Sequence, residues 1–512
     1  MADNPLRSST LIERCTLMMK AASLALLLAL LVSSAWTQDT QQPAPPPQSG
    51  APQATPVPGA GATVQDHPAQ QPSAPPKPIT KAQAKELFRS VDEILAFVSQ
   101  DTGLPIKHKV KRKLITRDQV QRYVEKHMKD DKDTQRLERS QLVLKKFGMI
   151  PQGYDLHAEF LKLLSEQVAA YYDSKTKTVN LLDWVQPELQ RPVLAHELTH
   201  ALQDQSVGLE KWMLAGAKDN DPLPDQPELL AEEAQAARQN VTEGQAMIAM
   251  LDYTLSPGGV NVLTAPDVVN AIRASMTDGK DAPVLSASPV FLRESLLMPY
   301  TFGLDLVREV LKEKGKVATF DGMLERPPVD TLQVMEPKAY IANQAAEPLI
   351  VPDLDKLVAP NYQRYDFGGM GAFDIYLLAK QYAPDADAKQ YYTHWRGGYY
   401  LAAHEKSAPK DQIALLYLSH WDSPEAAQAF AKLYNSYVPK RYKMPSGVAP
   451  GASAGGDTAG GTRFGWDFGE QGKVVIQTHG SDVLVQEGFD EATMERVRAA
   501  LLPGFVPVVT NQ

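Results

Sequence analysis

Cysteine is almost absent from this sequence: the 512 residues contain one, Cys15. It precedes an apolar run at residues 21–35, whereas a lipoprotein signal would place the modified cysteine after such a run. The remainder of the chain has no thiol for a disulfide, a zinc finger or a nucleophile. Cysteine-protease and zinc-finger functions are therefore excluded, and stability must come from packing.

The sequence also lacks an apolar run of the roughly 20 residues that a membrane-spanning helix needs. The segment AASLALLLALLVSSA at residues 21–35 is shorter, follows Arg14 and Lys20, and ends in small residues. This layout is typical of a bacterial-type secretory signal. We therefore expect residues 1–37 to be a signal peptide and the protein to be exported, to the periplasm or out of the cell. Contact with a membrane is expected only through an uncleaved signal.

A positive charge excess is absent too, because 52 basic residues face 61 acidic ones, for a formal net charge of -9. Nucleic acid is therefore not an expected partner. Residues 38–80 contain no aromatic residue and are rich in Pro, Gln, Ala and Gly. Such a segment cannot bury enough apolar surface to fold, so we expect a disordered linker. The oligomeric state is left open.

The remaining sequence predicts two folded α+β units. The first, residues 81–348, begins with a helix that ends at Gly103. It continues with a helix at 155–169, a hairpin at 171–182, a helix at 191–205 opened by Pro192, a polar loop at 206–225 and a long helix from Pro227 to about Asp252. The second unit, residues 358–506, is smaller and of unknown role. Its expected strands are 399–405, 413–418, 464–468, 473–478 and 483–487, and its expected helices begin near Asp422 and Asp490.

The chemistry lies in His196-Glu197-Leu198-Thr199-His200, an H-E-x-x-H pattern on a predicted helix. Residues i and i+4 share one helix face, so both imidazoles can bind one zinc ion. Glu197 would then take a proton from a water activated by the metal and pass it to the leaving amine. Two incidental core histidines are the alternative, but burying His196, Glu197 and His200 without a partner would be costly.

A catalytic zinc site needs a third protein ligand, and Glu243 on the following long helix is our candidate. Gly244 beside it would let that helix approach the metal-binding helix closely. An ordinary surface glutamate at this position is the alternative. Four other residues are candidates for the third ligand: Glu232 and Glu233, which fit a solvated helix face better, and His394 and His404.

These residues resemble a gluzincin, a member of the thermolysin-like clan, with H-E-x-x-H on one helix and a glutamate ligand on a later one. The resemblance covers roughly residues 155–255, with a longer gap between His200 and Glu243 than in thermolysin. The strings at 200–205, 299–300 and 326–328 also resemble uncharacterised secreted bacterial relatives of the clan. Membership implies a zincin-like domain with a small sheet, an active-site helix and a ligand helix. It also implies that peptide substrate pairs with an edge strand, for which the 171–182 hairpin is the candidate.

The sequence offers candidates for two further roles at the site, without deciding between them and a structural role. An oxyanion stabiliser is expected, and Tyr300 and His404 are candidates, although structural burial would explain either residue. Asp204 could accept the outer N–H of His200, or be an ordinary aspartate at a helix end. The sequence as a whole predicts an exported zinc metallopeptidase acting on peptide or protein substrates. The alternative is a zinc-stabilised envelope binding or scaffold protein without catalytic activity.

Overall fold

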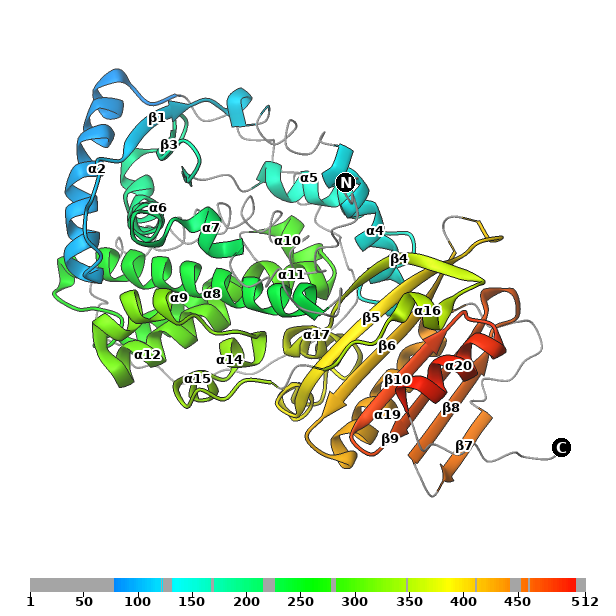
Figure 1. The fold of residues 1–512 in the computed structure, drawn as a ribbon. Coiled ribbons are helices and arrows are strands. Elements are labelled where there is room, and N and C mark those ends of the chain that lie inside the picture. Colours follow the sequence, from blue (N-terminus) through cyan, green and yellow to red (C-terminus); the bar gives the residue numbers. More distant parts are fainter. Residues whose placement is uncertain are drawn as a thin grey trace, which may run out of the picture.

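In the computed structural model of the protein, the described residues are 78–120, 122, 131–166, 170–214, 226–277, 282–346, 349–409, 412–442, 453–458 and 461–502. The expected signal peptide and nearly all of the expected linker lie outside this part of the chain. The described residues form a largely helical region, followed by a region built on a large sheet (Figure 1). The fold is thus α+β, as the sequence predicts. Within the described residues, no helix has both the length and the apolar composition needed to cross a bilayer.

The helical region contains a three-stranded sheet in the order β1-β3-β2. Strand β1 (Lys111–Ile115) pairs in parallel with β3 (Thr178–Leu182), and β2 (Tyr171–Asp173) pairs with β3 in antiparallel fashion. The predicted 171–182 hairpin is confirmed. Strand β1 was not expected, because its alternating lysines give it the composition of a solvated segment. The sheet leaves β2 at one edge, next to the helix that carries the H-E-x-x-H residues.

Helices make up the rest of this region, on the left of Figure 1, and most of them are short. Besides the two helices that carry the site, they are α2 (Lys81–Thr102), α4 (Asp131–Phe147), α5 (Leu156–Glu166), α7 (Leu209–Leu214), η1 (Ser256–Gly258), α9 (Pro266–Thr277), α10 (Pro283–Ala287), α11 (Val290–Met298), η2 (Pro299–Gly303), α12 (Leu304–Val317), η3 (Ala318–Gly322), α13 (Met323–Glu325), α14 (Thr331–Met335) and α15 (Pro337–Ile341). The expected end of the first helix at Gly103 is confirmed, since Gly103 is left-handed with a φ of 81°. The expected polar loop after residue 205 is wrong in part, because it contains α7.

The site is carried by α6 (Pro187–Val207) and α8 (Gln226–Leu255), which pack against each other and against α2. The long helix from about residue 227 is confirmed as α8. Helix α6 begins earlier than expected: Pro187 opens it, and Pro192 lies inside it. Five apolar side chains in the middle of α6 are at most 1% exposed and anchor the helix in the core; they are Val193, Leu194, Leu198, Ala201 and Leu202.

The second region is a seven-stranded sheet in the order β4-β5-β6-β10-β9-β8-β7. Its strands are antiparallel neighbours: β4 (Tyr362–Gly369), β5 (Trp395–Glu405), β6 (Ile413–Trp421), β7 (Ser453–Thr458), β8 (Gly461–Asp467), β9 (Lys473–His479) and β10 (Asp482–Glu487). Its helical elements are α16 (Leu354–Val358), α17 (Ala372–Tyr382), α18 (Lys389–Tyr392), α19 (Pro424–Arg441), η4 (Gly469–Gln471) and α20 (Glu491–Leu501). The five expected strands and both expected helices are confirmed. Strands β4 and β7 and helix α17 were not expected.

Helices cover both faces of the large sheet. Helices α16 and α20 pack on one face, and α17 and α19 contribute to a larger core on the other. That larger core also contains side chains of the helical region. Phe147 of α4 packs edge-on against Tyr400 and Tyr417 of the sheet, with ring centroids 5.5 and 5.6 Å apart. The two regions therefore share one continuous hydrophobic core.

A second contact between the regions involves the start of α8. The expectation that Glu232 and Glu233 lie on a solvated face is wrong. Glu232 is 2% exposed, and its Oε2 accepts a hydrogen bond of 2.8 Å from the Gly369 N–H at the end of β4. Glu233 is partly buried, and its Oε2 accepts from the Thr331 N–H and hydroxyl at 2.9 and 2.8 Å. These backbone donors come from distant segments, so helix periodicity alone could not indicate them.

This contact predicts a pH-dependent stability. Burial raises the pKa of Glu233 to about 8. The carboxyl of Asp374, in the first turn of α17, acts on Glu233, and burial raises its own pKa to about 7. Because both values exceed the unfolded ones, the folded protein retains protons that the unfolded chain releases. Their stabilisation is therefore complete below about pH 4 and is lost as the pH rises toward 8.

In the variant Glu233→Gln, the side chain at position 233 is uncharged at every pH. We expect it to raise the free energy of unfolding at pH 8.5 by about 1–3 kcal/mol, with little change at pH 4.5. Urea unfolding at the two pH values measures this difference. The exposed Glu470→Gln serves as the control, and an equal effect of Glu233→Gln at both pH values would contradict the prediction.

Candidate metal centre

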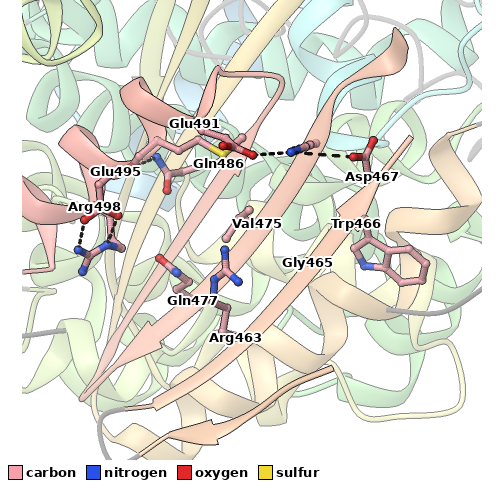
Figure 2. Close-up of a pocket in the computed structure, with 12 residues that line it drawn as sticks. Arg463, Gly465, Trp466, Asp467, Val475, Gln477, Gln486, Glu491, Glu495 and Arg498 are labelled. Atoms are coloured by element: carbon pink, nitrogen blue, oxygen red, sulfur yellow. Dashed lines mark hydrogen bonds and ion pairs between the residues drawn. The ribbon is translucent and has the colours of Figure 1, made fainter. Parts of the chain in front are cut away.

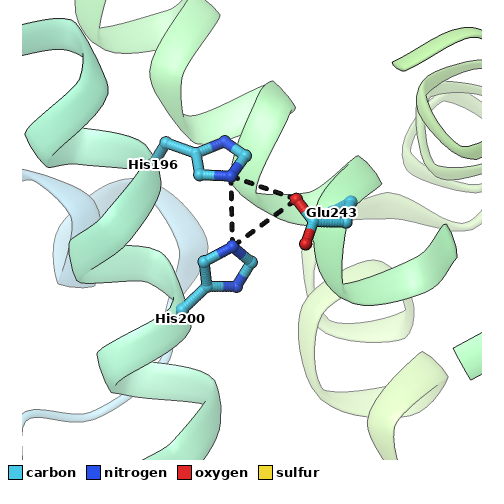
Figure 3. Close-up of side chains that lie close together, drawn as sticks. All are labelled: His196, His200 and Glu243. Atoms are coloured by element: carbon cyan, nitrogen blue, oxygen red, sulfur yellow. Dashed lines mark hydrogen bonds and ion pairs between the residues drawn. The ribbon is translucent and has the colours of Figure 1, made fainter. Parts of the chain in front are cut away.

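Three side chains from two helices meet at one point. His196 and His200 come from successive turns of α6, and Glu243 comes from the middle of α8 (Figure 3). Their ligand atoms all lie within 4.8 Å of one another, and no other such group of three occurs in the described part of the chain. His196 is 1% exposed, the Glu243 side chain 8% and the His200 side chain 14%. The group is thus buried, and His200 is its most accessible member.

The spacing of the three ligand atoms fits a tetrahedral metal ion. Nε2 of His196 lies 3.1 Å from Nε2 of His200 and 3.2 Å from Oε2 of Glu243, and the third side of the triangle is 3.6 Å. Zinc bonds of about 2.0–2.1 Å at tetrahedral angles would place ligand atoms about 3.3 Å apart. Two imidazoles and a carboxylate are also a typical donor set for zinc. These residues therefore fit a metal ion, and a fourth position remains for water or substrate.

The electrostatics of the three groups are strongly coupled. Burial lowers the pKa of His196. Burial also acts to lower the pKa of His200, but the Glu243 carboxylate outweighs it and raises that pKa to about 9. Burial acts to raise the pKa of Glu243, but the two imidazoles hold it well below its usual value. Without a metal, Glu243 is therefore an ionised carboxylate beside the protonated ring of His200. A divalent cation that binds the three side chains would replace the proton on this ring.

Glu197 lies beside this triangle and is not part of it. It is 4% exposed, and its Oε2 accepts a hydrogen bond of 2.7 Å from the Tyr172 N–H on the edge strand β2. Burial raises the pKa of Glu197 to about 7. One carboxylate oxygen of Glu197 is therefore held by the edge of the sheet.

Asp204 has a different role from the one expected. It does not accept the outer N–H of His200, and the partner of His200 Nδ1 is Gln203 Oε1 at 2.9 Å. Asp204 Oδ2 instead accepts from the Tyr172 hydroxyl at 2.7 Å and pairs with Lys177 Nζ at 2.6 Å. The longer Gln203 side chain reaches the imidazole ring, whereas Asp204 ties the β2–β3 hairpin to α6.

Gly244 also differs from expectation. A Cβ at this position would lie 2.4 Å from the carbonyl oxygen of Gly303, and one at Gly303 would lie 2.7 Å from the carbonyl oxygen of Asn240. The two glycines therefore allow a close approach between α8 and η2, not between α8 and the metal-binding helix as predicted. The glycine correctly predicts a close contact between helices, but the element that it contacts depends on tertiary structure.

The other four candidates for the third ligand do not belong to the metal group. Glu232 and Glu233 bind backbone groups at the other end of α8. His394 pairs with Asp422 at 2.9 Å, and His404 Nδ1 contacts the Gln412 carbonyl oxygen at 2.9 Å, both in the C-terminal region. Tyr300 is 1% exposed in η2. Glu243 is thus the candidate that the structure places beside the two histidines, and neither oxyanion candidate gains support.

A cavity of about 470 Å³ lies elsewhere, between α20 and strands β8, β9 and β10 (Figure 2). Four of the charged side chains that line it form ion pairs: Lys473 Nζ lies 2.5 Å from Glu491 Oε1, and Arg498 pairs with Glu495. None of the residues that line it belongs to the metal group. The cavity is therefore separate from the candidate metal centre.

Comparisons with known proteins bear on the C-terminal region. Residues 357–498 match the family model described as a domain of unknown function, DUF8575. No curated protein and no solved structure matches the chain. The matched residues span β4 to most of α20 and include none of the metal-centre side chains. The C-terminal region is thus similar to DUF8575 domains, and the metal centre rests on its own geometry.

Proposed function

We propose that this protein is an exported zinc-dependent metallopeptidase. The observation that carries the proposal is the triangle of His196, His200 and Glu243 beside the buried carboxylate of Glu197. Three protein ligands that leave a position open are typical of catalytic zinc, whereas structural zinc sites have four. The signal-like segment at residues 21–35 supports the proposed export.

In the proposed reaction, the zinc ion and the side chains of the protein have separate roles. A bound zinc ion polarises the scissile carbonyl and lowers the pKa of water. His196, His200 and Glu243 would hold that ion, and Glu197 would accept the proton of the attacking water at Oε1 and return it to the departing amine. The Tyr172 N–H would keep Oε2 of Glu197 in place during both transfers.

Strand β2 is the proposed substrate-binding edge. It is one of the two edge strands of its sheet, and its Tyr172 contacts Glu197 directly. The resemblance to gluzincins implies that extended peptide pairs with such a strand. Backbone pairing binds many sequences and leaves selectivity to side-chain pockets, so peptides and unfolded proteins are the proposed substrates.

Metal removal tests this function. We expect the purified full chain to contain about one zinc ion and to cleave members of a broad peptide library. Chelation by 1,10-phenanthroline should abolish cleavage, and added zinc should restore it, because the chain's own residues cannot polarise the carbonyl as zinc does. A zinc-loaded protein that cleaves no peptide would contradict the peptidase and favour the scaffold alternative.

A further inference from the structure

We propose that Gln203 and Gln245 are positioning residues that hold His200 in the one tautomer able to bind a metal through Nε2. The inference rests on the proposed metal binding, but it does not depend on peptide hydrolysis. It assigns a role to two buried amides that are not metal ligands. Both side chains are fully buried, so their polar atoms must find partners within the protein.

The amides form a chain of hydrogen bonds that runs from the imidazole ring into the protein. Gln203 Oε1 lies 2.9 Å from His200 Nδ1, and Gln203 Nε2 donates to Gln245 Oε1 at 2.8 Å. Gln203 Nε2 also donates to the Thr242 carbonyl oxygen at 3.0 Å. Gln245 Nε2 donates in turn to the carbonyl oxygen of Thr319 at 2.6 Å.

The direction of this chain is set at its buried end. A backbone carbonyl only accepts, so the Gln245 NH₂ group must face Thr319 and its oxygen must face Gln203. Gln203 then faces two acceptors, Thr242 O and Gln245 Oε1, and must turn its own NH₂ group toward them. Its oxygen is left for His200 Nδ1, which must carry the proton. The lone pair of a neutral His200 is thereby placed on Nε2, the atom that points into the triangle.

This arrangement matters because a free neutral imidazole exists in two tautomers, and one of them has a proton on Nε2 and cannot bind a metal there. Hydrogen-bonding partners of ligand histidines commonly contribute about 10–100-fold to metal affinity. The chain of amides also joins both ligand helices. Gln203 is three residues after His200 on α6, and Gln245 is two residues after Glu243 on α8. It therefore fixes the two ligands relative to each other as well as orienting the ring.

The test compares zinc affinity among full-length variants by competition with a chromophoric chelator. Gln203→Met keeps the size of the side chain but removes the acceptor, and we expect about 10–100-fold weaker zinc binding. Gln245→Met leaves the contact between Gln203 and His200 in place but removes its support, so a loss of several-fold is expected.

Gln190→Met is the matched control. Gln190 is another buried amide of α6; it is bonded to the backbone of Leu182 and Val185 and to none of the three candidate ligands. Its loss should lower the free energy of unfolding as much as Gln203→Met but leave zinc affinity unchanged. The cobalt-substituted protein gives a second readout, since its visible absorption should change in Gln203→Met and not in Gln190→Met.

The outcomes separate this inference from the proposed function. A wild-type chain that binds no zinc would overturn the metal centre itself. If the wild type binds zinc and Gln203→Met binds it within two-fold, or if Gln190→Met loses as much affinity, the positioning role is overturned and the metal centre stands.

Discussion

Replacing Glu197 with Gln is expected to lower kcat for peptide hydrolysis by about 10²–10⁴-fold while zinc stays bound. Glutamine has the shape of glutamate and can still accept the Tyr172 N–H through its amide oxygen, but it cannot take a proton from water. Glu197 is not a corner of the ligand triangle, so zinc content should remain that of the wild type. Rates on a peptide substrate, measured beside zinc content for both proteins, test this expectation.

Glu188→Gln is the matched control for this variant, because Glu188 is an exposed glutamate in the first turn of the same helix. It should retain wild-type rates and wild-type zinc content. If Glu197→Gln hydrolysed peptides at the wild-type rate, the general-base role would be wrong. If it lost its zinc instead, Glu197 would have to be counted among the groups that hold the metal.

Replacing Glu243 with Ala is expected to weaken zinc binding as much as His200→Ala does. Each change removes one of the three proposed ligands. Loss of a residue that only hydrogen-bonds to a ligand lowers metal affinity by up to roughly 100-fold, so we expect a larger loss of zinc affinity here. Zinc at 1,000 times its Kd stabilises a folded protein by about 4.1 kcal/mol. The zinc-induced rise in Tm should therefore be large for the wild type and small for both variants at the same zinc concentration.

Gln235→Ala, on the same helix but outside the metal group, is the control and should keep the full zinc-induced rise. Unchanged zinc affinity in Glu243→Ala would show that another residue is the third ligand. Equal losses in Glu243→Ala and His200→Ala would support the triangle as the binding unit.

The local features of the site were predictable because they depend on helix periodicity. His196 and His200 are one turn apart in any helix, and a glutamate on the next long helix was a reasonable third ligand. The supporting contacts depend on tertiary structure. Gln203 could have been suggested by its i+3 spacing from His200, but nothing in the sequence indicates that Gln245 lies next to it.

The fold, like the site, was predictable only where a feature depends on a single element. Elements with a clear apolar pattern, such as the continuous apolar run of β6 and the capped amphipathic helix α19, were predicted within a few residues. Strand β1 was missed because lysines alternate with its inward-facing side chains. The buried state of Glu232 was missed because its partner is the backbone of Gly369, which is 137 residues away. Periodicity describes one element at a time, whereas these features arise where two distant elements meet.

The placement of Phe147 between the two regions has a consequence for protein engineering. A fragment cut near residue 350 would keep all three ligands and Glu197 but would uncover the aromatic surface on which Tyr400 and Tyr417 rest. It would also leave the Glu232 carboxylate without the Gly369 N–H. Recombinant production of the helical region alone would therefore favour aggregation, and any shortened version of the protein must retain the sheet.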